Sequence, residues 1–258
     1  MSATFKQTDA CCSSPPVVTG NDYKPLGEYV EQDGTKMYIT GPPTSPNALL
    51  ILYDIFGYWP QTLQGADILS RTTPSGTLCI MPDFFGDSPA DPSWYPPQTP
   101  EHEAAIKAFF TAQKIQDGLN LVRSIQSAIQ AKYPQIEKWG ILGYCWGGFI
   151  ALNEVSLPES KFDACVGCHP GFVSPQMASQ IRVPVLAMLS EEEVDDPDRK
   201  PFYEALNPEV KQGTKFVEFH DMVHGWMSAK GDLGNEKARE GYIKAYDIVK
   251  GWLEEHLK

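Results

Sequence analysis

Apolar-rich runs alternate with amphipathic segments along most of the chain. A continuous run of about 4–8 apolar residues is typical of a strand that is buried on both faces of a sheet. Such runs predict strands over residues 48–53, 78–81, 139–143, 164–168, 183–189 and 215–219. Apolar residues at helical spacing predict helices over 61–71 and 101–133, and further helices that begin near Gly147, Ser174, Arg199 and Glu236. This alternation favours the α/β class, with a mainly parallel central sheet and helices on both faces.

The amino-terminal part has a different pattern. Residues 1–25 show no hydrophobic period, so we expect an irregular N-terminal arm there. Two short alternating runs then flank Asp33-Gly34, which is a hairpin turn signal. The rest of the chain contains no internal repeat, and its length fits one hydrophobic core. Residues 26–258 are therefore expected to form a single domain.

The composition excludes some partners. The chain has 258 residues and a formal net charge of -12 at pH 7. An acidic surface repels phosphate groups, so we expect no binding to nucleic acid or to a membrane surface. No apolar run approaches the ~18 residues that a membrane helix needs, and residues 1–14 lack a secretory pattern. We expect a cytoplasmic monomer or homodimer whose six cysteines are reduced thiols.

The strongest candidate for chemistry is the segment Gly143-Tyr144-Cys145-Trp146-Gly147-Gly148, which lies between a predicted strand and a predicted helix. This is the context of a nucleophile elbow, a turn so tight that only glycine fits beside the nucleophile. The positive N-terminus of the helix favours a thiolate. The alternative is a buried structural cysteine beside a glycine-rich turn. The context favours Cys145 as the nucleophile of an α/β-hydrolase fold.

A thiol nucleophile needs a general base, which an α/β-hydrolase provides as a late histidine. His224 follows the last predicted strand and is the candidate base. His220 is its main competitor, although we expect it to make a hydrogen bond within the loop. His102 and His256 are expected to be solvated on polar helices. His169 is expected to be structural, with a place in the pocket wall as the alternative.

The acid that orients this histidine should follow the predicted strand 183–189. Residues 190–198 contain six carboxylates, most of which must be solvated surface charge. Glu193 is the favoured triad acid, followed by Asp195 and then by Asp196. The resulting order along the chain, nucleophile then acid then histidine, is that of the α/β-hydrolases.

Another carboxylate, Asp54, follows the predicted strand 48–53. The carboxyl ends of such strands face the ligand crevice, so Asp54 is expected near Cys145. The structural alternative for Asp54 is a local turn or a helix cap. The backbone N–H groups of Trp146 and Ile55 are the candidate donors of an oxyanion hole, which stabilises charge that develops in the transition state.

Together these residues resemble the dienelactone hydrolase family, the carboxymethylenebutenolidases. Its members carry a Gly-Tyr-Cys-x-Gly-Gly elbow, here residues 143–148, and an acidic residue followed by Ile-Phe-Gly, here residues 54–57. They also carry a Pro-Asp strand end, here Pro82-Asp83, and a late His-Gly-aromatic segment, here residues 224–226. The similarity runs from about Leu26 to the carboxyl terminus, and the leading arm with its cysteines is more similar to fungal members.

The resemblance implies a single-domain hydrolase of lactones or esters without a metal or an organic cofactor. From the candidate residues themselves we expect a thioester on Cys145, which is hydrolysed with the help of His224 and its acid. The resemblance also implies a role for Asp54, because the family's acidic residue at this place contacts the thiol and helps to deprotonate it. The bacterial lactonases carry glutamate there, which reaches one methylene further than this aspartate.

The substrate pocket is expected to depart from that of the bacterial lactonases. Those enzymes bind the substrate carboxylate with two arginines, whereas the nearest cation after the late histidine here is Lys230. A lone lysine binds a carboxylate with less geometric selectivity than paired arginines. A proline-rich loop should line the pocket with the aromatic side chains of Phe84, Phe85, Trp94 and Tyr95. We therefore expect a larger or less charged lactone or ester as substrate.

Three other functions fit parts of the sequence. The same site can serve ring rearrangement, dehydration or acyl transfer in secondary metabolism, because a fold does not determine chemistry. A thiol redox protein would use Cys165-Val166-Gly167-Cys168, but this segment ends a predicted buried strand instead of preceding a helix. A binding protein without catalysis is disfavoured by the presence of both Cys145 and His224.

Overall fold

One eight-stranded sheet organises the chain. The computed structural model describes residues 14–17 and 23–258. Its strands are β1 (Glu28–Gln32), β2 (Thr35–Thr40), β3 (Asn47–Leu52), β4 (Leu78–Pro82), β5 (Lys138–Tyr144), β6 (Ala164–Cys168), β7 (Val185–Ser190) and β8 (Lys215–Phe219). They lie in the order β1-β2-β4-β3-β5-β6-β7-β8. Pairs β1–β2 and β2–β4 are antiparallel and the others are parallel, which confirms the predicted hairpin and the mainly parallel sheet.

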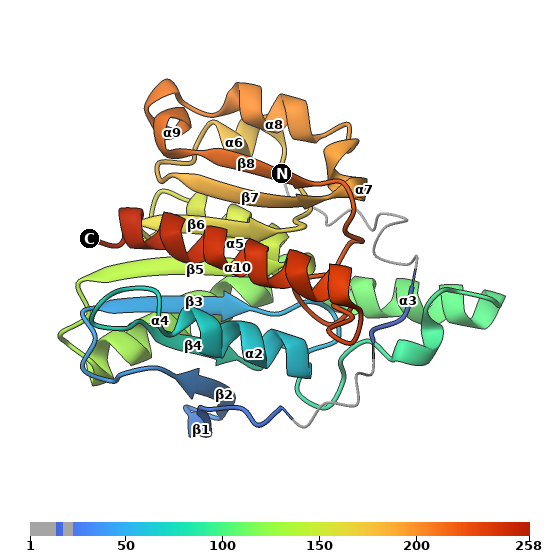
Figure 1. The fold of residues 1–258 in the computed structure, drawn as a ribbon, viewed down its shortest axis with the longest axis horizontal. Helices are drawn as coiled ribbons and strands as arrows, with labels where there is room; N and C mark the ends of the chain where they lie inside the picture. The colour runs from blue at the N-terminus through green and yellow to red at the C-terminus, as the bar shows by residue number, and fades with distance from the viewer. Residues whose placement is uncertain (1–13, 18–22) are drawn as a thin grey trace.

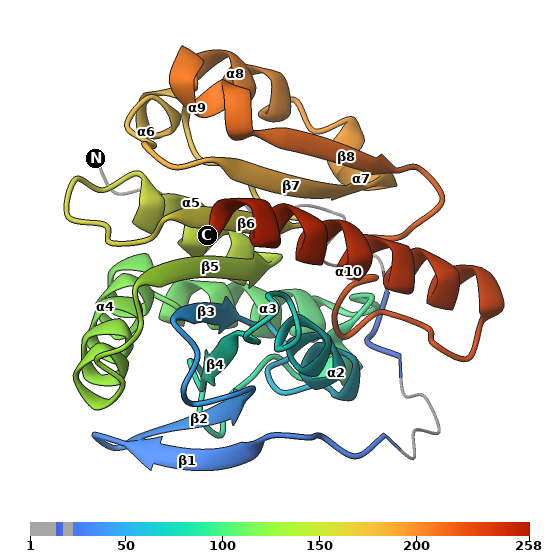
Figure 2. The ribbon, with the colours of Figure 1, turned by 60° about the vertical axis from the view of Figure 1, so that its left-hand side comes forward.

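Helices cover both faces of this sheet, as predicted. They are α2 (Pro60–Leu69), α3 (Pro100–Ala112), α4 (Ile115–Lys132), α5 (Trp146–Val155), α6 (Pro175–Ala178), α7 (Glu191–Val194), α8 (Arg199–Ala205), α9 (Pro208–Gly213) and α10 (Glu236–His256), with a 3-10 turn η1 (Pro92–Trp94). Helices α2 and α10 pack together on one face, and α4 and α5 pack together on the other (Figures 1 and 2).

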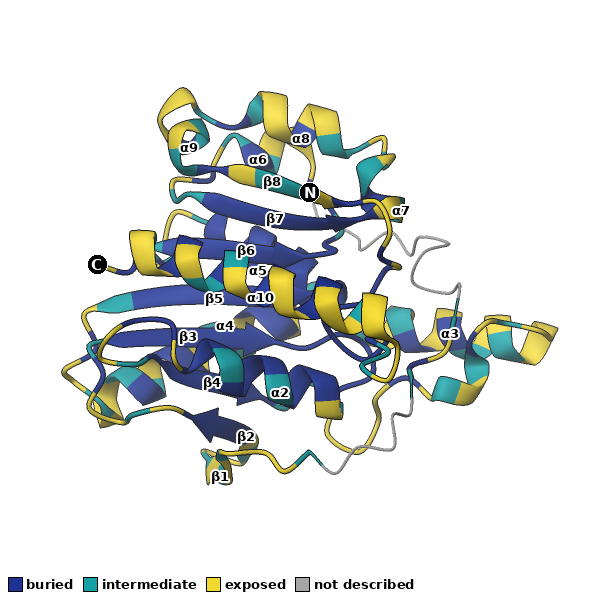
Figure 3. Cartoon of the chain, viewed as in Figure 1, coloured by how far each residue is buried: buried dark blue, intermediate teal, exposed yellow. Residues whose placement is uncertain are grey.

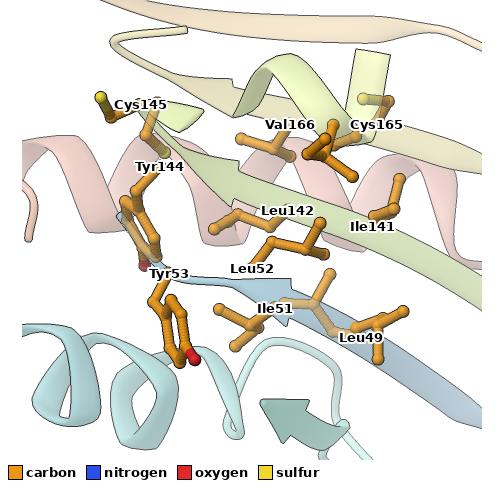
Figure 4. Close-up of a cluster of buried hydrophobic side chains, with 14 of the residues drawn as sticks. Leu49, Ile51, Leu52, Tyr53, Ile141, Leu142, Tyr144, Cys145, Cys165 and Val166 are labelled. Carbon is orange, nitrogen blue, oxygen red and sulfur yellow. The ribbon is translucent and has the colours of Figure 1, made fainter. Parts of the chain in front are cut away.

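The central parallel strands form the core. Every residue of β3, β4, β6 and β7 is buried, and Figure 3 shows the buried sheet between helices whose outer faces are exposed. Side chains such as Leu49, Leu142 and Val166 gather in one cluster across neighbouring strands (Figure 4). Burial of each such side chain stabilises the fold by roughly 1.5–3 kcal/mol. This contribution explains why continuous apolar runs predict the strands well.

The helix predicted over residues 101–133 is wrong in its length, because the segment forms two helices. α3 ends at Ala112 and α4 begins at Ile115, with two non-helical residues between them. The linking residues include no proline or glycine. α4 packs its apolar face on α5, whereas α3 buries only Ile106 and Phe109. The two helices therefore separate because they have different packing partners.

The hydrophobic pattern does not predict every part of the chain. The short elements α7, α9 and η1 are too brief to show a period. The predicted arm over residues 1–25 lies mostly outside the described residues, as do Cys11 and Cys12, and its described part contains no helix or strand. Among the helices of residues 14–17 and 23–258, none is both long enough and apolar enough to cross a membrane.

The carboxyl ends of the parallel strands meet at one edge of the sheet, and the candidate residues follow them. Asp54 comes after β3, Cys145 after β5 and His169 after β6. Glu193 lies in α7, directly after β7, and His224 lies in the loop after β8. The topology therefore brings residues that are far apart in the sequence to one crevice, as is general for open parallel sheets.

The turn from β5 into α5 depends on glycine. Cys145 has φ 52° and ψ −113°, a backbone conformation that side-chain-bearing residues rarely adopt. A Cβ on Gly143 would lie 2.1 Å from the carbonyl oxygen of Gly147. A Cβ on Gly147 would lie 2.3 Å from the carbonyl oxygen of Leu52, in β3. Only glycine therefore allows α5 to begin this close to the backbone of β3.

We expect Gly147→Ala to lower the free energy of unfolding by about 3 kcal/mol, because the new methyl group meets the backbone of β3. The melting temperature, measured by calorimetry, tests this. Gly251→Ala is the matched control: Gly251 is exposed in α10, and its new Cβ has no atom within 4 Å. Alanine there should raise stability by about 0.5–1 kcal/mol. Equal melting temperatures for the two variants would contradict the role of the close approach.

Candidate active site

Cys145 lies at the junction of β5 and α5. Figure 4 shows its side chain at the end of the strand, with Sγ turned away from the buried cluster. The residue is 3% exposed, and its N–H donates to the carbonyl oxygen of Cys168 (3.0 Å), the last residue of β6. α5 begins at Trp146. The thiol is therefore at the positive end of a helix, where a thiolate is favoured.

His224 and Glu193 form a buried pair. His224 Nδ1 lies 2.5 Å from Glu193 Oε1, and each residue is 4% exposed. A carboxylate at Nδ1 keeps the hydrogen of the neutral ring on that nitrogen, so that Nε2 carries the lone pair. The ring is then prepared to accept a proton at Nε2. The structure thus brings together the histidine and the acid that the sequence favoured.

The first turn of α7 supplies this acid. Glu193 Oε2 accepts from the N–H (2.9 Å) and from Oγ (2.6 Å) of Ser190, the N-cap residue, so one carboxylate both caps the helix and binds His224. Glu192 Oε2 accepts from the backbone N–H of His224 (3.0 Å). Ser190 and Glu192 were not among the sequence candidates. The Ser-x-x-Glu spacing of a capping box is the signal that could have identified Ser190.

The other carboxylates considered for the triad have other surroundings. Asp195 is the exposed C-cap residue of α7. Asp196 Oδ1 accepts from the N–H of Asp198 (2.8 Å), two residues further along the same loop. Glu193 is the carboxylate at the imidazole of His224, so the geometry favours it among the three candidates.

Asp54 is 3% exposed. Its hydrogen bonds connect the loop after β3 to the loop after β8. Its Oδ1 accepts from the N–H of Phe56 (2.9 Å), which is the local turn of the structural interpretation. Its Oδ2 accepts from Ser228 Oγ (2.6 Å) and from the N–H of Ala229 (3.2 Å), in the loop after β8. Burial raises the pKa of Asp54, and these hydrogen bonds and the charge of Lys230 oppose that rise.

The two candidate oxyanion donors lie on neighbouring elements. Trp146 is the first residue of α5, so its N–H has no acceptor within the helix. Ile55 is buried and follows Asp54 in the loop after β3. Because α5 packs against β3, the two residues lie on adjacent segments at the same edge of the sheet. This arrangement is compatible with two N–H groups that donate to the same oxyanion.

Two of the four aromatic residues predicted for the pocket pack against the elbow, and a third packs on Phe56. The ring centroids of Phe84 and Phe85 lie 5.5 Å and 4.9 Å from that of Trp146. The ring of Tyr95 contacts that of Phe56, with centroids 5.3 Å apart. Phe85 and Tyr95 are themselves buried. Part of this set is therefore core that supports the site.

Two other residues predicted for the pocket differ from each other in exposure. Trp94 lies in η1 and is half-buried against the core. Lys230 is buried, which is rare for lysine. Its charge acts on the pKa values of both Asp54 and His169. The lysine is therefore held inside the protein near these two groups.

His169 is completely buried and contacts the candidate base. The ring centroids of His169 and His224 lie 4.8 Å apart, in an edge-to-face arrangement. Within the described part of the chain, neither ring nitrogen of His169 has a hydrogen-bond partner. Burial lowers the pKa of His169 well below its usual value, and the charges of His224 and Lys230 act in the same direction.

The other histidines have other partners. His220 is largely exposed, and its Nε2 lies 3.1 Å from Glu218 Oε2, so its partner is a side chain of β8 and not a group of the loop. His102 lies in the first turn of α3. His256 ends α10, where its ring contacts that of Trp252.

Cys165 and Cys168 are free thiols within β6. Side chains three residues apart in a strand point to opposite faces, and burial raises the pKa of both thiols. The segment therefore lacks the exposed, low-pKa thiol of a redox motif. Among residues 14–17 and 23–258, no group of three or more His, Cys, Asp and Glu side chains could hold a metal ion.

The amino-terminal segment makes a contact that the sequence pattern did not indicate. The N–H of Val17 donates to the carbonyl oxygen of Ala229 (2.9 Å). The carbonyl oxygen of Val17 accepts from Trp59 Nε1 and from Gln61 Nε2, each at 3.0 Å. This segment therefore ties the start of α2 to the loop after β8. No local pattern marks a single valine for such a role.

Comparison with known proteins identifies the family of the chain. The family model described as "Dienelactone hydrolase family" matches residues 36–257. An uncharacterized AIM2 family protein of Schizosaccharomyces pombe is 29% identical over 252 residues, which cover 95% of this chain and 98% of the relative. The carboxymethylenebutenolidase homolog of Homo sapiens is 28% identical over 245 residues, which cover 92% of this chain and 94% of the relative.

A solved structure shows the same fold. Dienelactone hydrolase from Anabaena variabilis aligns with a TM-score of 0.60 and 13% sequence identity, over 90% of this chain and 98% of that protein. This likeness establishes the α/β-hydrolase fold, and the match of the family model to most of the chain establishes the family. The chain belongs to the dienelactone hydrolase family and is a hydrolase of carboxylic esters or lactones.

Proposed function

We propose that the chain is a cysteine-dependent hydrolase that cleaves a small lactone or ester through a thioester on Cys145. The observation that carries the proposal is the positive φ of Cys145, which presents the thiol at the start of α5. Such a conformation costs ~1–3 kcal/mol and is concentrated at functional sites. The buried pair of His224 and Glu193 at the same edge of the sheet is the kind of base that a thiol nucleophile needs.

In the first half of the proposed reaction, the proton of Cys145 passes to His224 Nε2 and Sγ attacks the carbonyl carbon of the substrate. Glu193 stabilises the imidazolium. The N–H groups of Trp146 and Ile55 stabilise the negative charge that develops on the carbonyl oxygen. The carbon–oxygen bond then breaks, the leaving oxygen takes the proton from His224, and a thioester remains.

In the second half, His224 accepts a proton from water, which attacks the thioester carbonyl. The carbon–sulfur bond breaks, the product acid leaves and the thiol of Cys145 is restored. An enol is a good leaving group, so enol-lactones suit this route better than amides. Asp54 is proposed to assist the first proton transfer, because a carboxylate with a raised pKa is a stronger base than an ordinary one.

The surroundings of the elbow support a substrate of modest charge. Phe84 and Phe85 place aromatic surface around Trp146, and Lys230 is the cation proposed to face the substrate. We therefore propose a larger or less charged lactone or ester than the substrate of the bacterial lactonases. The cysteines at positions 79, 145, 165 and 168 are free and buried, which fits the reducing environment of the cytoplasm, and we propose that the protein works there.

Cys145→Ala is expected to reduce turnover by about 10⁴-fold or more, because the variant cannot form the thioester. The assay is hydrolysis of a panel of enol-lactones and esters that includes dienelactone and p-nitrophenyl acetate. Cys165→Ala is the control, since it removes a buried thiol from β6 and should retain turnover. Equal turnover by the native protein and Cys145→Ala would show that Cys145 is not the nucleophile.

Glu193→Gln is expected to lower kcat by about 10²–10⁴-fold with little change in KM, because the amide cannot stabilise the imidazolium of His224. Steady-state kinetics on the best substrate of the panel measure both constants. Asp195→Asn removes the same charge from an exposed position in the same segment and should leave kcat unchanged. A greater loss in Asp195→Asn than in Glu193→Gln would reverse the assignment of the acid.

Asp54→Asn is expected to lower kcat/KM by about 100-fold at neutral pH, because the neutral amide cannot act as a base that assists the transfer of the thiol proton to His224. Its melting temperature should fall, because an amide has one acceptor oxygen in place of the two that accept from Phe56, Ser228 and Ala229. The fall should be larger at low pH, because a carboxyl whose pKa is raised by burial stabilises the fold there and loses that contribution as the pH rises through its pKa. Ser228→Ala removes one donor to Asp54 and keeps the carboxylate. It should lower the melting temperature, while kcat/KM should stay close to the native value. An unchanged kcat/KM in Asp54→Asn would leave Asp54 a purely structural role.

A further inference from the structure

His169 combines features that each reduce stability. Its ring is completely buried, and neither ring nitrogen has a hydrogen-bond partner among the residues that the structure describes. Its backbone has φ 41°, in the left-handed region that residues other than glycine rarely adopt. A buried polar atom without a partner and a left-handed backbone are both unfavourable, and their coincidence at one residue indicates a function.

Backbone hydrogen bonds hold His169 between the strand ends of the site. Its N–H donates to the carbonyl oxygen of Met188 (2.7 Å) in β7, the strand that leads into α7. The preceding residue, Cys168, accepts from the N–H of Cys145 (3.0 Å). The position of His169 is thus coupled both to the elbow and to the strand that supplies the acid.

The ring of His169 forms one wall around the ring of His224. Their centroids lie 4.8 Å apart with an interplanar angle of 62°. On other sides His169 contacts Trp226, at 5.4 Å between centroids, and Tyr144, at 6.1 Å. Glu193 holds the imidazole of His224 at Nδ1, and a hydrogen bond at one atom still allows the ring to tilt. Packing against His169 limits that tilt.

The groups around His169 keep it neutral. The titratable side chains that face it are Tyr144 at the end of β5, and His224 and Lys230 in the loop after β8. Burial and the charges of His224 and Lys230 all lower the pKa of His169. A neutral ring does not repel an imidazolium, and in a low-dielectric interior its electron-rich face and its dipole attract one.

We propose that His169 is a positioning residue that holds the imidazole of His224 in the orientation that accepts the proton of Cys145 and that stabilises its charged form. The proposal rests on the proposed function, in which His224 is the base. An aliphatic side chain could fill the same space, but it could not present a polar aromatic ring to the imidazolium.

The test compares His169→Leu and His169→Asn with the native protein. Leucine fills a similar volume without a ring, and asparagine tolerates the left-handed backbone, so that at least one variant is expected to fold. In both variants kcat for the best substrate of the panel should fall about 10- to 100-fold with little change in KM. Calorimetry should find both melting temperatures within a few degrees of the native value.

A second measurement needs no substrate. Alkylation of Cys145 by iodoacetamide, followed at the Cys145 peptide by mass spectrometry, reports the thiolate as a function of pH. In His169→Leu the midpoint should move up by about half a pH unit or more, because the thiolate–imidazolium pair loses stabilisation. Thr77→Val is the control. Thr77 Oγ is also buried without a partner among the described residues, but it precedes β4 at the opposite edge of the sheet.

The control variant Thr77→Val should leave both kcat and the alkylation profile unchanged. Native kcat and a native alkylation profile in both His169 variants overturn the proposal. An equal loss in Thr77→Val also overturns it, because the effect would then be a general loosening of the fold. If the native protein hydrolyses no substrate of the panel, the proposed function fails, and the alkylation profile still tests the contact of His169 with His224.

Discussion

The close approach of α5 to β3 is the constraint on which the rest of the site depends. With glycine at position 147, the first turn of the helix lies against the carbonyl groups of Leu52 and Tyr53. The chain then has to turn within one residue, and Cys145 takes a positive φ as a result. The thiol is thereby held at the N-terminal end of a helix and at the carboxyl edge of the sheet. The other candidate groups, such as His224 and Asp54, are candidates because they lie at the same edge of the sheet as this turn.

Two buried carboxylates hold the irregular loops around the thiol in place. Glu193 caps α7 with one oxygen and holds His224 with the other. Asp54 closes a turn after β3 with one oxygen and holds Ser228, in the loop after β8, with the other. The same hydrogen bonds therefore organise the loops and orient the candidate reacting groups. This coupling explains how loops without regular structure can hold a site within fractions of an ångström.

Family membership indicates the reaction class, and the side chains around the elbow bear on the choice of substrate. The match to the dienelactone hydrolase family assigns the reaction class, hydrolysis of carboxylic esters or lactones. The choice of substrate depends on side chains outside the elbow, such as Phe84, Phe85 and Lys230. Around the elbow the structure places aromatic rings packed on Trp146 and a buried lysine whose charge acts on Asp54. The proposed substrate class follows from these surroundings.

The sequence by itself determined the sheet class, most strands and the elbow, because these depend on local patterns. Continuous apolar runs mark strands that are buried on both faces, and glycine spacing marks a turn that larger residues cannot make. It also limited the candidates for the triad acid to a nine-residue segment, since the order of the elements along an α/β-hydrolase chain is regular.

Only the tertiary structure decided which groups meet in space. Among six nearby carboxylates it placed Glu193 at the ring of His224, and it separated α3 from α4 and placed Val17 on Ala229 and His169 against His224. The three contacts have no local signature, because each joins segments that are distant in the sequence, and the break between α3 and α4 depends on what each helix packs against. The energies of these contacts come from burial and from hydrogen bonds that exist only once the sheet has formed.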